Sequence, residues 1–355
     1  MKTLILITLS MVLICQAHSD NYNWDIIDRQ GNVVHKVYNA RSVSPFSEGI
    51  LVIKYKDRIV FLNEDFEETF SSSSFSLAPF EEMQNNRLGF YDRDSDKLGY
   101  LNRDGKVVIK PQQYDYIGKF VHGYAVVGFG DTSEPTPHHL EYRIIDLFGN
   151  YASPIIFDRV ELSRYDPGKG IGSKPNENIT FFIKLNQSQW KIAENKGDFK
   201  EIVSKGFGER LVARTEDGFG VITWEGEILL KPAYKAIWSV SKWGALVTIR
   251  RNDIVVDYEG NEILADKDVR DVWSDYAVFI GLNDKQGVYD LSQEKDIVPP
   301  MYDSIVLSSG NEFQVSLDGK KGYVNSEGEV LGEIKYDLTL YFSDGLGVAG
   351  IIIED

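Results

Sequence analysis

Residues 97–126 have the sequence KLGYLNRDGKVVIKPQQYDYIGKFVHGYAV, and this stretch decides the fold. Two β-rich runs, Leu98–Leu101 and Lys106–Ile109, flank the tetrapeptide Asn102-Arg-Asp-Gly105. An Asn that opens a turn can accept a hydrogen bond from the backbone two residues on. A Gly three residues later can take the positive φ that closes a type I turn with a bulge. The stretch therefore predicts a β-hairpin.

The same turn recurs along the whole chain, which indicates a repeat fold. The residue that opens the turn recurs every 29–48 positions: Asp28, Asn63, Asn102, Asp146, Glu194, Thr223, Asp257, Asp290 and Asn325. Seven of these residues are followed, three positions later, by a predicted structural glycine: Gly31, Gly105, Gly149, Gly197, Gly226, Gly260 and Gly328.

Two further elements complete the unit. An aromatic residue beside a polar one follows the turn, as in Tyr114-Asp115, and then a Phe-containing turn leads into an apolar strand, as in Phe120-Val-His-Gly123. Such a unit cannot bury its own apolar face, so neighbouring units must stack. Nine units are expected, beginning near residues 23, 58, 97, 141, 189, 218, 252, 285 and 320.

This repeat resembles the WG-repeat family, also called KWG repeats, over almost all of the chain after residue 19. Lys97–Val126 and Lys320–Val348 match best, whereas the tryptophan of the family pattern is present only at Trp24 and Trp190. The resemblance implies an all-β repeat fold and says little about activity. Two architectures suit tandem hairpin units: a closed ring like a β-propeller, which we favour, and an open β superhelix or solenoid.

The N-terminus predicts export. Lys2 precedes an apolar run from Leu4 to Ile14, and Ala17-His18-Ser19 has small residues where a signal peptidase cleaves. We expect residues 1–19 to be a signal peptide, residues 20–355 to be the repeat domain, and the location to be secreted, periplasmic or cell-envelope. The alternative is a lipid anchor on Cys15, which Ile14 disfavours because a small residue is wanted there.

The net charge and the cysteine content limit which partners and which metal sites are expected. The formal charge of −16 repels phosphate backbones, so nucleic acid is not expected as a partner. Cys15 is the only cysteine, so removal of the signal leaves neither a disulfide nor a thiolate metal site. After the signal, no apolar run is long enough to span a membrane.

Metal-binding patterns are weak. Asp92, Asp94 and Asp96 alternate as in a calcium loop, but Lys97 stands where that loop needs glycine, so a solvated hairpin tip is favoured. His138 and His139 are a remote zinc possibility with Glu141. No cofactor is expected.

Binding surfaces are sought in insertions and aromatics. Gly130–His139 and Pro167–Asn178 are interpreted as inserted loops, with Gly168, Gly170 and Gly172 in a linker. Trp238, Trp243 and Trp273 are interpreted first as packing anchors and second as a surface that stacks on sugars or a peptide.

No catalytic motif appears: there is no Gly-x-Ser-x-Gly, and the five histidines have no triad-like setting. The leading hypothesis is a non-enzymatic binding or scaffold protein outside the cytoplasm that recognises a protein or a polysaccharide. The alternative is a propeller-type enzyme acting on glycans through clustered carboxylates and aromatics. Two carboxylates about 5–10 Å apart in a tight pocket would favour the enzyme, and a shallow aromatic groove would favour binding.

Overall fold

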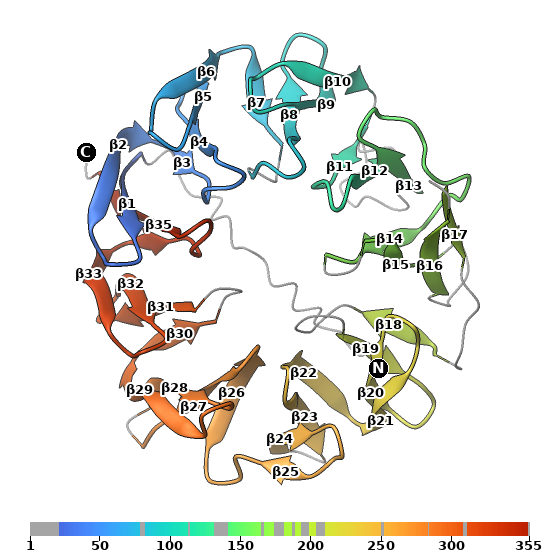
Figure 1. Cartoon of the computed structure of the whole chain (residues 1–355), viewed down its shortest axis with the longest axis vertical. Helices are drawn as coiled ribbons and strands as arrows, with labels where there is room; N and C mark the ends of the chain where they lie inside the picture. The colour runs from blue at the N-terminus through green and yellow to red at the C-terminus, as the bar shows by residue number, and fades with distance from the viewer. Residues whose placement is uncertain are drawn as a thin grey trace, which may run out of the picture.

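The computed structural model describes residues 21–78, 82–112, 114–130, 141–164, 167–173, 181–186, 189–192, 199–203, 210–249, 252–282, 284–307 and 311–353. Within these residues the chain is all-β, with 35 strands in nine small antiparallel sheets. The sheets stand in a ring like the blades of a propeller (Figure 1). The predicted all-β propeller is therefore confirmed, and the ring is closed rather than an open superhelix.

Each blade is a consecutive run of strands, numbered here from the innermost to the outermost. Blade 1 combines the last two and the first two strands: β34 (Leu338–Thr339), β35 (Leu346–Ile352), β1 (Tyr22–Asp28) and β2 (Val33–Ala40). Blade 2 comprises β3 (Ser42–Val43), β4 (Leu51–Lys54), β5 (Ile59–Leu62) and β6 (Glu68–Ser72). Blade 3 comprises β7 (Phe75–Leu77), β8 (Leu88–Asp92), β9 (Lys97–Leu101) and β10 (Val107–Gln112). Blade 4 has three strands: β11 (Tyr116–Ile117), β12 (Tyr124–Phe129) and β13 (Glu141–Asp146).

The remaining blades each have four strands. Blades 5 and 6 comprise β14 (Arg159–Leu162), β15 (Lys169–Ser173), β16 (Phe181–Asn186) and β17 (Gln189–Ile192), then β18 (Glu201–Val203), β19 (Arg210–Arg214), β20 (Phe219–Thr223) and β21 (Ile228–Tyr234). Blade 7 comprises β22 (Ala236–Val240), β23 (Gly244–Ile249), β24 (Asn252–Asp257) and β25 (Glu262–Ile263). Blade 8 comprises β26 (Asp268–Trp273), β27 (Tyr276–Ile280), β28 (Gln286–Asp290) and β29 (Lys295–Tyr302). Blade 9 comprises β30 (Ser304–Val306), β31 (Glu312–Leu317), β32 (Lys320–Asn325) and β33 (Val330–Tyr336).

The antiparallel order of the strands gives the ring two different faces. Because neighbouring strands alternate in direction, the turn between the first and second strands (the inner turn) and the turn between the third and fourth strands (the outer turn) lie on one face. We call it the turn face. The second-to-third-strand turns and the connections between blades lie on the opposite face.

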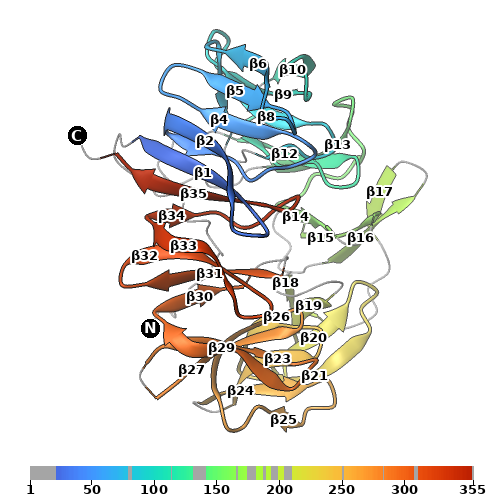
Figure 2. The same cartoon turned by 60° about the vertical axis from the view of Figure 1, so that its left-hand side comes forward.

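The ring closes where β1 pairs with β35. The pairing runs in register from Tyr22↔Ile352 to Asp28↔Leu346, and Figure 2 shows β1 between β2 and β35. The Tyr336 hydroxyl of blade 9 donates a hydrogen bond to Asp25 Oδ2 of blade 1 (3.0 Å). Most units identified in the sequence begin at the third strand of one blade and end in the next, so the first and last share blade 1.

The outer turns are type I turns with a bulge. Asp28 shows the geometry: its carbonyl oxygen accepts the Gly31 N–H (3.0 Å), its own N–H donates to Asn32 O (3.0 Å), and its Oδ1 accepts the N–H groups of Gln30 and Asn32. The glycines at this position have φ between +72° and +90°: Gly31, Gly105, Gly149, Gly226, Gly260 and Gly328. Gly197 lies outside the described residues.

A second reason for glycine at these turns is close packing against the preceding blade. A Cβ at Gly31 would stand 2.3 Å from the backbone nitrogen of Gly332 on β33, and one at Gly105 would stand 2.0 Å from the Phe70 ring on β6. At Gly328 the obstacle is Ile297 O on β29, at 2.2 Å. Each outer turn is thus fitted to the outermost strand of its neighbour.

The apolar core lies between blades, as stacking units require. Phe61 of blade 2 packs in one cluster with Phe90 and Leu101 of blade 3, and Val288 of blade 8 packs with Phe313 of blade 9. Within the described ranges, no helix is long and apolar enough to span a membrane.

Blade 5 departs from two sequence interpretations. The Gly168–Gly172 segment is not a linker, because Gly170 and Gly172 belong to β15, which pairs with β14 and β16. Glycine is needed there since a Cβ at Gly170 would lie 2.8 Å from Glu161 O. Trp190 lies on β17, the outermost strand, rather than on a third strand, so the unit placed near residue 189 is out of phase with the blade.

The fit of Gly328 is tested against Gly319, a glycine of the same blade. Gly328→Ala combines positive φ (+84°) with a backbone clash, whereas Gly319 has φ +79° and no atom within 4 Å of an added Cβ. Left-handed strain alone costs about 1–3 kcal/mol. We expect Gly319→Ala to lower the free energy of unfolding by about that amount and Gly328→Ala to lower it by more, measured by urea denaturation. Equal losses would contradict the packing argument.

Candidate functional site

Inner turns of neighbouring blades are joined by hydrogen bonds. In blade 2 the Glu48 carboxylate accepts the backbone N–H groups of Asn85 (2.6 Å) and Asn86 (2.7 Å) from blade 3. Asn85 Oδ1 in turn accepts the Gly123 N–H of blade 4 (2.7 Å), and His122 Nε2 lies 3.0 Å from Arg164 O of blade 5. These contacts fix the turn face around blades 2 to 5.

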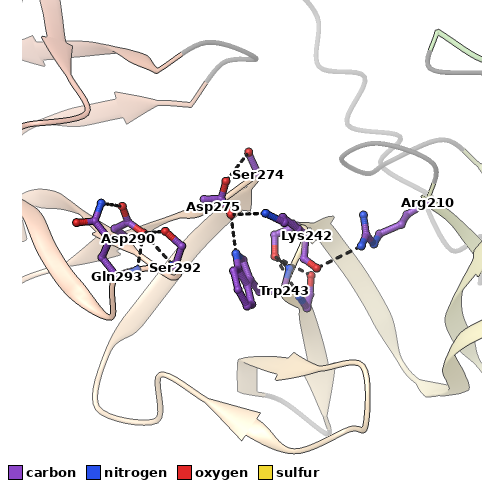
Figure 3. A network of polar contacts seen from close by, with 10 residues as sticks. Arg210, Lys242, Trp243, Ser274, Asp275, Asp290, Ser292 and Gln293 are labelled. Atoms are coloured by element: carbon purple, nitrogen blue, oxygen red, sulfur yellow. Dashed lines mark hydrogen bonds and ion pairs between the residues drawn. The ribbon is translucent and has the colours of Figure 1, made fainter.

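A similar series of hydrogen bonds joins blades 6 to 8 and includes charged and aromatic side chains (Figure 3). Arg210 Nη2 donates to Lys242 O (3.2 Å), and the Lys242 N–H donates to Ser274 O (3.1 Å). The Arg210 guanidinium also lies 5.1 Å from the ring centroid of Tyr258, whose hydroxyl donates to Ser241 O (2.6 Å). The inner turn of blade 7 is therefore held from both sides.

Trp243 is the exposed aromatic of this series. Its Nε1 donates to Asp275 Oδ1 of blade 8 at 2.7 Å. The Lys242 ammonium lies 3.5 Å from the same oxygen and 5.4 Å from a ring of Trp243. The indole is nevertheless 41% exposed. The result is an aromatic surface that is open to solvent but fixed in orientation.

Asp290 is the opening residue of the outer turn of blade 8, and its side chain holds that turn in place. Its buried carboxylate accepts hydrogen bonds from the N–H and Oγ of Ser292 (2.8 and 2.6 Å) and from the N–H and Nε2 of Gln293 (2.9 and 2.7 Å). Burial by itself raises the pKa of Asp290, but these hydrogen bonds outweigh it and hold the pKa below its usual value. The Gln293 amide is thereby oriented at the surface.

An open cleft of approximately 530 Å³ lies between blades 8 and 9 beside this turn. Its lining residues come from the turn-face ends of both blades: Tyr276, Gln293, Lys295, Asp296 and Ile297 from blade 8, and Asn311, Ser326 and Glu327 from blade 9. Asp296 is paired with Lys267 at 2.8 Å. We call the cleft together with Trp243 and Asp275 the blade 7–9 rim.

The three predicted tryptophans do not form one surface. Trp243 belongs to the rim, and Trp273 is half-buried at the end of β26, two residues before Asp275. Trp238 is 50% exposed on β22, and its Nε1 donates to Thr248 Oγ1 (2.9 Å) and Asp253 Oδ1 (3.3 Å). Both of these acceptors lie toward the opposite face.

The acidic run Asp92, Asp94 and Asp96 forms the β8–β9 turn on the opposite face. Asp96 has φ +57° and accepts the Tyr91 hydroxyl, while Asp92 accepts the Ser95 hydroxyl. In the part of the chain that the structure describes, no three His, Cys, Asp or Glu side chains gather as metal ligands. Calcium binding by this turn remains untested.

The expected insertions lie largely outside the described residues. This holds for residues 131–140 and 174–178, whereas Pro167 and Gly168 precede β15, which contains residues 169–173. His138 and His139 also lie outside the described residues, and Glu141 is the first residue of β13.

Most residues of the rim, and those that hold it in place, were not identified from the sequence. Asp275 and Gln293 of the rim and the supporting Arg210 and Lys242 come from three blades, and no local spacing links them. The usable signal was the pair Lys242-Trp243 just before Gly244, where other units have a polar inner turn such as Ser47-Glu48-Gly49. A single exposed aromatic is common on protein surfaces, so this signal alone did not identify the rim.

Acid titration tests the Asp290 anchor. A carboxylate whose folded pKa is depressed stabilises the fold fully above its unfolded pKa, about 3.9, and loses that contribution as pH falls through the folded value. Asp290→Asn is expected to cost about 1–3 kcal/mol at pH 7 and to flatten the acid-side decline in unfolding free energy. Urea denaturation from pH 7 to 3 measures both. Asp94→Asn, on the exposed tip, is the matched control; an unchanged pH profile in Asp290→Asn would contradict the anchor.

Comparisons with known proteins found one family model that matches part of the sequence and several solved structures of low sequence identity. Apo AztD from Citrobacter koseri is 12% identical, with a TM-score of 0.42 over 94% of this chain and 99% of that one. BamB from Moraxella catarrhalis is 9% identical, with a TM-score of 0.39 over 94% and 92%. No curated protein matches the sequence. The family model described as WG containing repeat matches residues 99–132, which confirms the predicted resemblance to WG repeats over that part of the chain.

Proposed function

We propose that this chain is a non-enzymatic binding or scaffold protein that acts outside the cytoplasm and recognises a protein or a polysaccharide at the blade 7–9 rim. The observation that carries the proposal is Trp243. Its indole is exposed, yet Asp275 fixes its orientation through a hydrogen bond of 2.7 Å, and the next residue, Tyr276, lines the open cleft. A fixed aromatic surface loses little side-chain entropy when a partner covers it.

The propeller gives this surface a rigid support. Hydrogen bonds between blades hold Lys242 to Arg210 and to Ser274, and the cleft is built from turns of two packed blades. Binding sites on rigid elements keep their geometry better than sites on isolated loops. The rim therefore suits recognition of an extended partner across several blades.

The carboxylates that line the two pockets are engaged by neighbouring side chains, which favours binding over catalysis. A small cavity of approximately 10 Å³ between blades 3 and 4 contains one carboxylate, Glu82, which pairs with Lys119 (2.6 Å) and accepts the Tyr341 hydroxyl. In the rim cleft, Asp296 is held by Lys267, and Glu327 accepts a hydrogen bond from the Ser326 hydroxyl (3.1 Å). These engaged carboxylates give no support to the alternative of a glycan-active enzyme, which needs an acid and a base or nucleophile free to act.

Export is part of the proposal. Residues 1–19 lie outside the described residues, and the support is the signal-like sequence alone. Exported protein is expected to begin at Asp20 and to carry no lipid, which intact-mass spectrometry of the secreted or periplasmic protein would measure. A diacylated N-terminal Cys15 would contradict this and would place the protein on a membrane surface.

Hydrogen exchange tests where a partner binds. The mature chain is mixed separately with the soluble protein fraction and the polysaccharide fraction of the producing cell's envelope and medium. We expect slower exchange of the inner-turn and outer-turn amides of blades 7 to 9 with one fraction, and unchanged exchange in the outer turns of blades 2 and 3. Protection elsewhere only, or breakdown of the bound polymer with release of reducing ends, would refute the proposal.

A further inference from the structure

We infer that the blade 7–9 rim takes a neutral polysaccharide, with one sugar ring on Trp243 and the neighbouring sugars hydrogen-bonded in the cleft between blades 8 and 9. The inference rests on the proposed binding function and specifies its ligand class. It follows from three properties of the rim: a fixed aromatic platform, a polar lining and balanced charge.

Trp243 provides the platform. The face of a sugar ring that presents C–H groups stacks on an aromatic face, and indole offers a large area for this contact. Asp275 Oδ1 takes the indole N–H at 2.7 Å, while Ser241 Oγ accepts the backbone N–H groups of Trp243 and Gly244, both at 3.1 Å. The ring and its turn are thus ordered before any ligand arrives, which lowers the entropic cost of stacking.

The cleft provides hydrogen-bonding groups of both kinds. Gln293, Asn311 and Ser326 are amides and a hydroxyl, which can donate and accept, as sugar hydroxyls do. Gln293 Nε2 donates to Asp290 Oδ2 (2.7 Å), so the amide is held with a defined orientation. Ile297 and the side chain of Tyr276 add a small apolar contribution to the lining.

Charge excludes an anionic ligand. Lys295 and Glu327 contribute opposite charges to the cleft, and Asp296 is matched by Lys267 at 2.8 Å. The cleft therefore has no cationic excess to attract a polyanion, and the whole chain, with a formal charge of −16, repels one. A ligand without charge encounters neither repulsion nor the cost of desolvating an unpaired ion.

The same lining favours a polysaccharide over a protein partner. The buried centre of a protein interface is apolar and poor in charged residues. Here the cleft is lined mostly by polar and charged side chains, and Trp243 is not part of its lining. The cleft is open and is lined by residues of blades 8 and 9, including Tyr276, the residue after the Asp275 that holds Trp243. Such an open, extended surface suits the interior of a polymer better than a single small molecule.

Affinity electrophoresis of the mature chain tests the inference, with neutral polysaccharides (laminarin, xyloglucan, galactomannan and dextran) or anionic ones (alginate and polygalacturonate) in the gel. At least one neutral polymer is expected to retard the protein, and neither anionic one. Trp243→Ala should weaken binding at least about tenfold. Trp243→Phe, which keeps an aromatic ring, should stay within about threefold of the parent. Gln293→Ala should give an intermediate loss.

Phe148→Ala is the matched control, because Phe148 is an 80% exposed aromatic in the outer turn of blade 4 on the same face, and it should bind as the parent does. Retardation by anionic polymers alone, by none, or equally with and without Trp243 would overturn the inference. Its failure is distinguishable from failure of the proposed function. If hydrogen exchange shows protection of blades 7 to 9 by the protein fraction only, the binding function stands and the polysaccharide ligand is wrong.

Discussion

The pairing of β1 with β35 is the constraint on which the rest of the ring depends. Seven residue pairs, from Tyr22↔Ile352 to Asp28↔Leu346, join the start of the described chain to its end. Blades of this kind bury their apolar residues against one another, so an open ring would leave two blade faces exposed. Closure covers both faces and makes each inner turn the neighbour of two others. The hydrogen bonds between turns that order the rim form only when neighbouring inner turns lie side by side in this way.

Sequence reasoning reached the architecture because its information is local and repeated. Asp28 and Gly31 determine one hairpin by turn chemistry alone, and the same chemistry recurs around the ring. The repeat pattern did not reveal the second reason why these turns need glycine. That reason is the close approach of Ile297 O or the Phe70 ring from the preceding blade. It also failed in blade 5, where the close approach of three strands, and not a flexible link, requires Gly170.

The candidate site was predicted only in part, for a physical reason. Trp243 was named from the sequence with Trp238 and Trp273, first as a packing anchor and only second as a binding surface. Its significance comes from Asp275, in the next blade, and from Gln293, a further hairpin away. Such partners meet only through the packing of blades, and blade packing leaves no short-range pattern. The acidic run at Asp92 has a clear local pattern, yet the turn satisfies two of its carboxylates with neighbouring hydroxyls.

The rim combines features that ordinarily oppose each other. An exposed indole gains from being covered, whereas charged groups lose hydration when they are covered. Here the charges nearest the platform are already matched, since Lys242 shares Asp275 with the indole N–H and Lys267 holds Asp296. Covering the rim therefore costs less desolvation than its number of charged side chains suggests. A ligand that brings hydroxyl groups replaces water at the remaining polar atoms, so the gain from stacking on Trp243 is retained in the net free energy of binding.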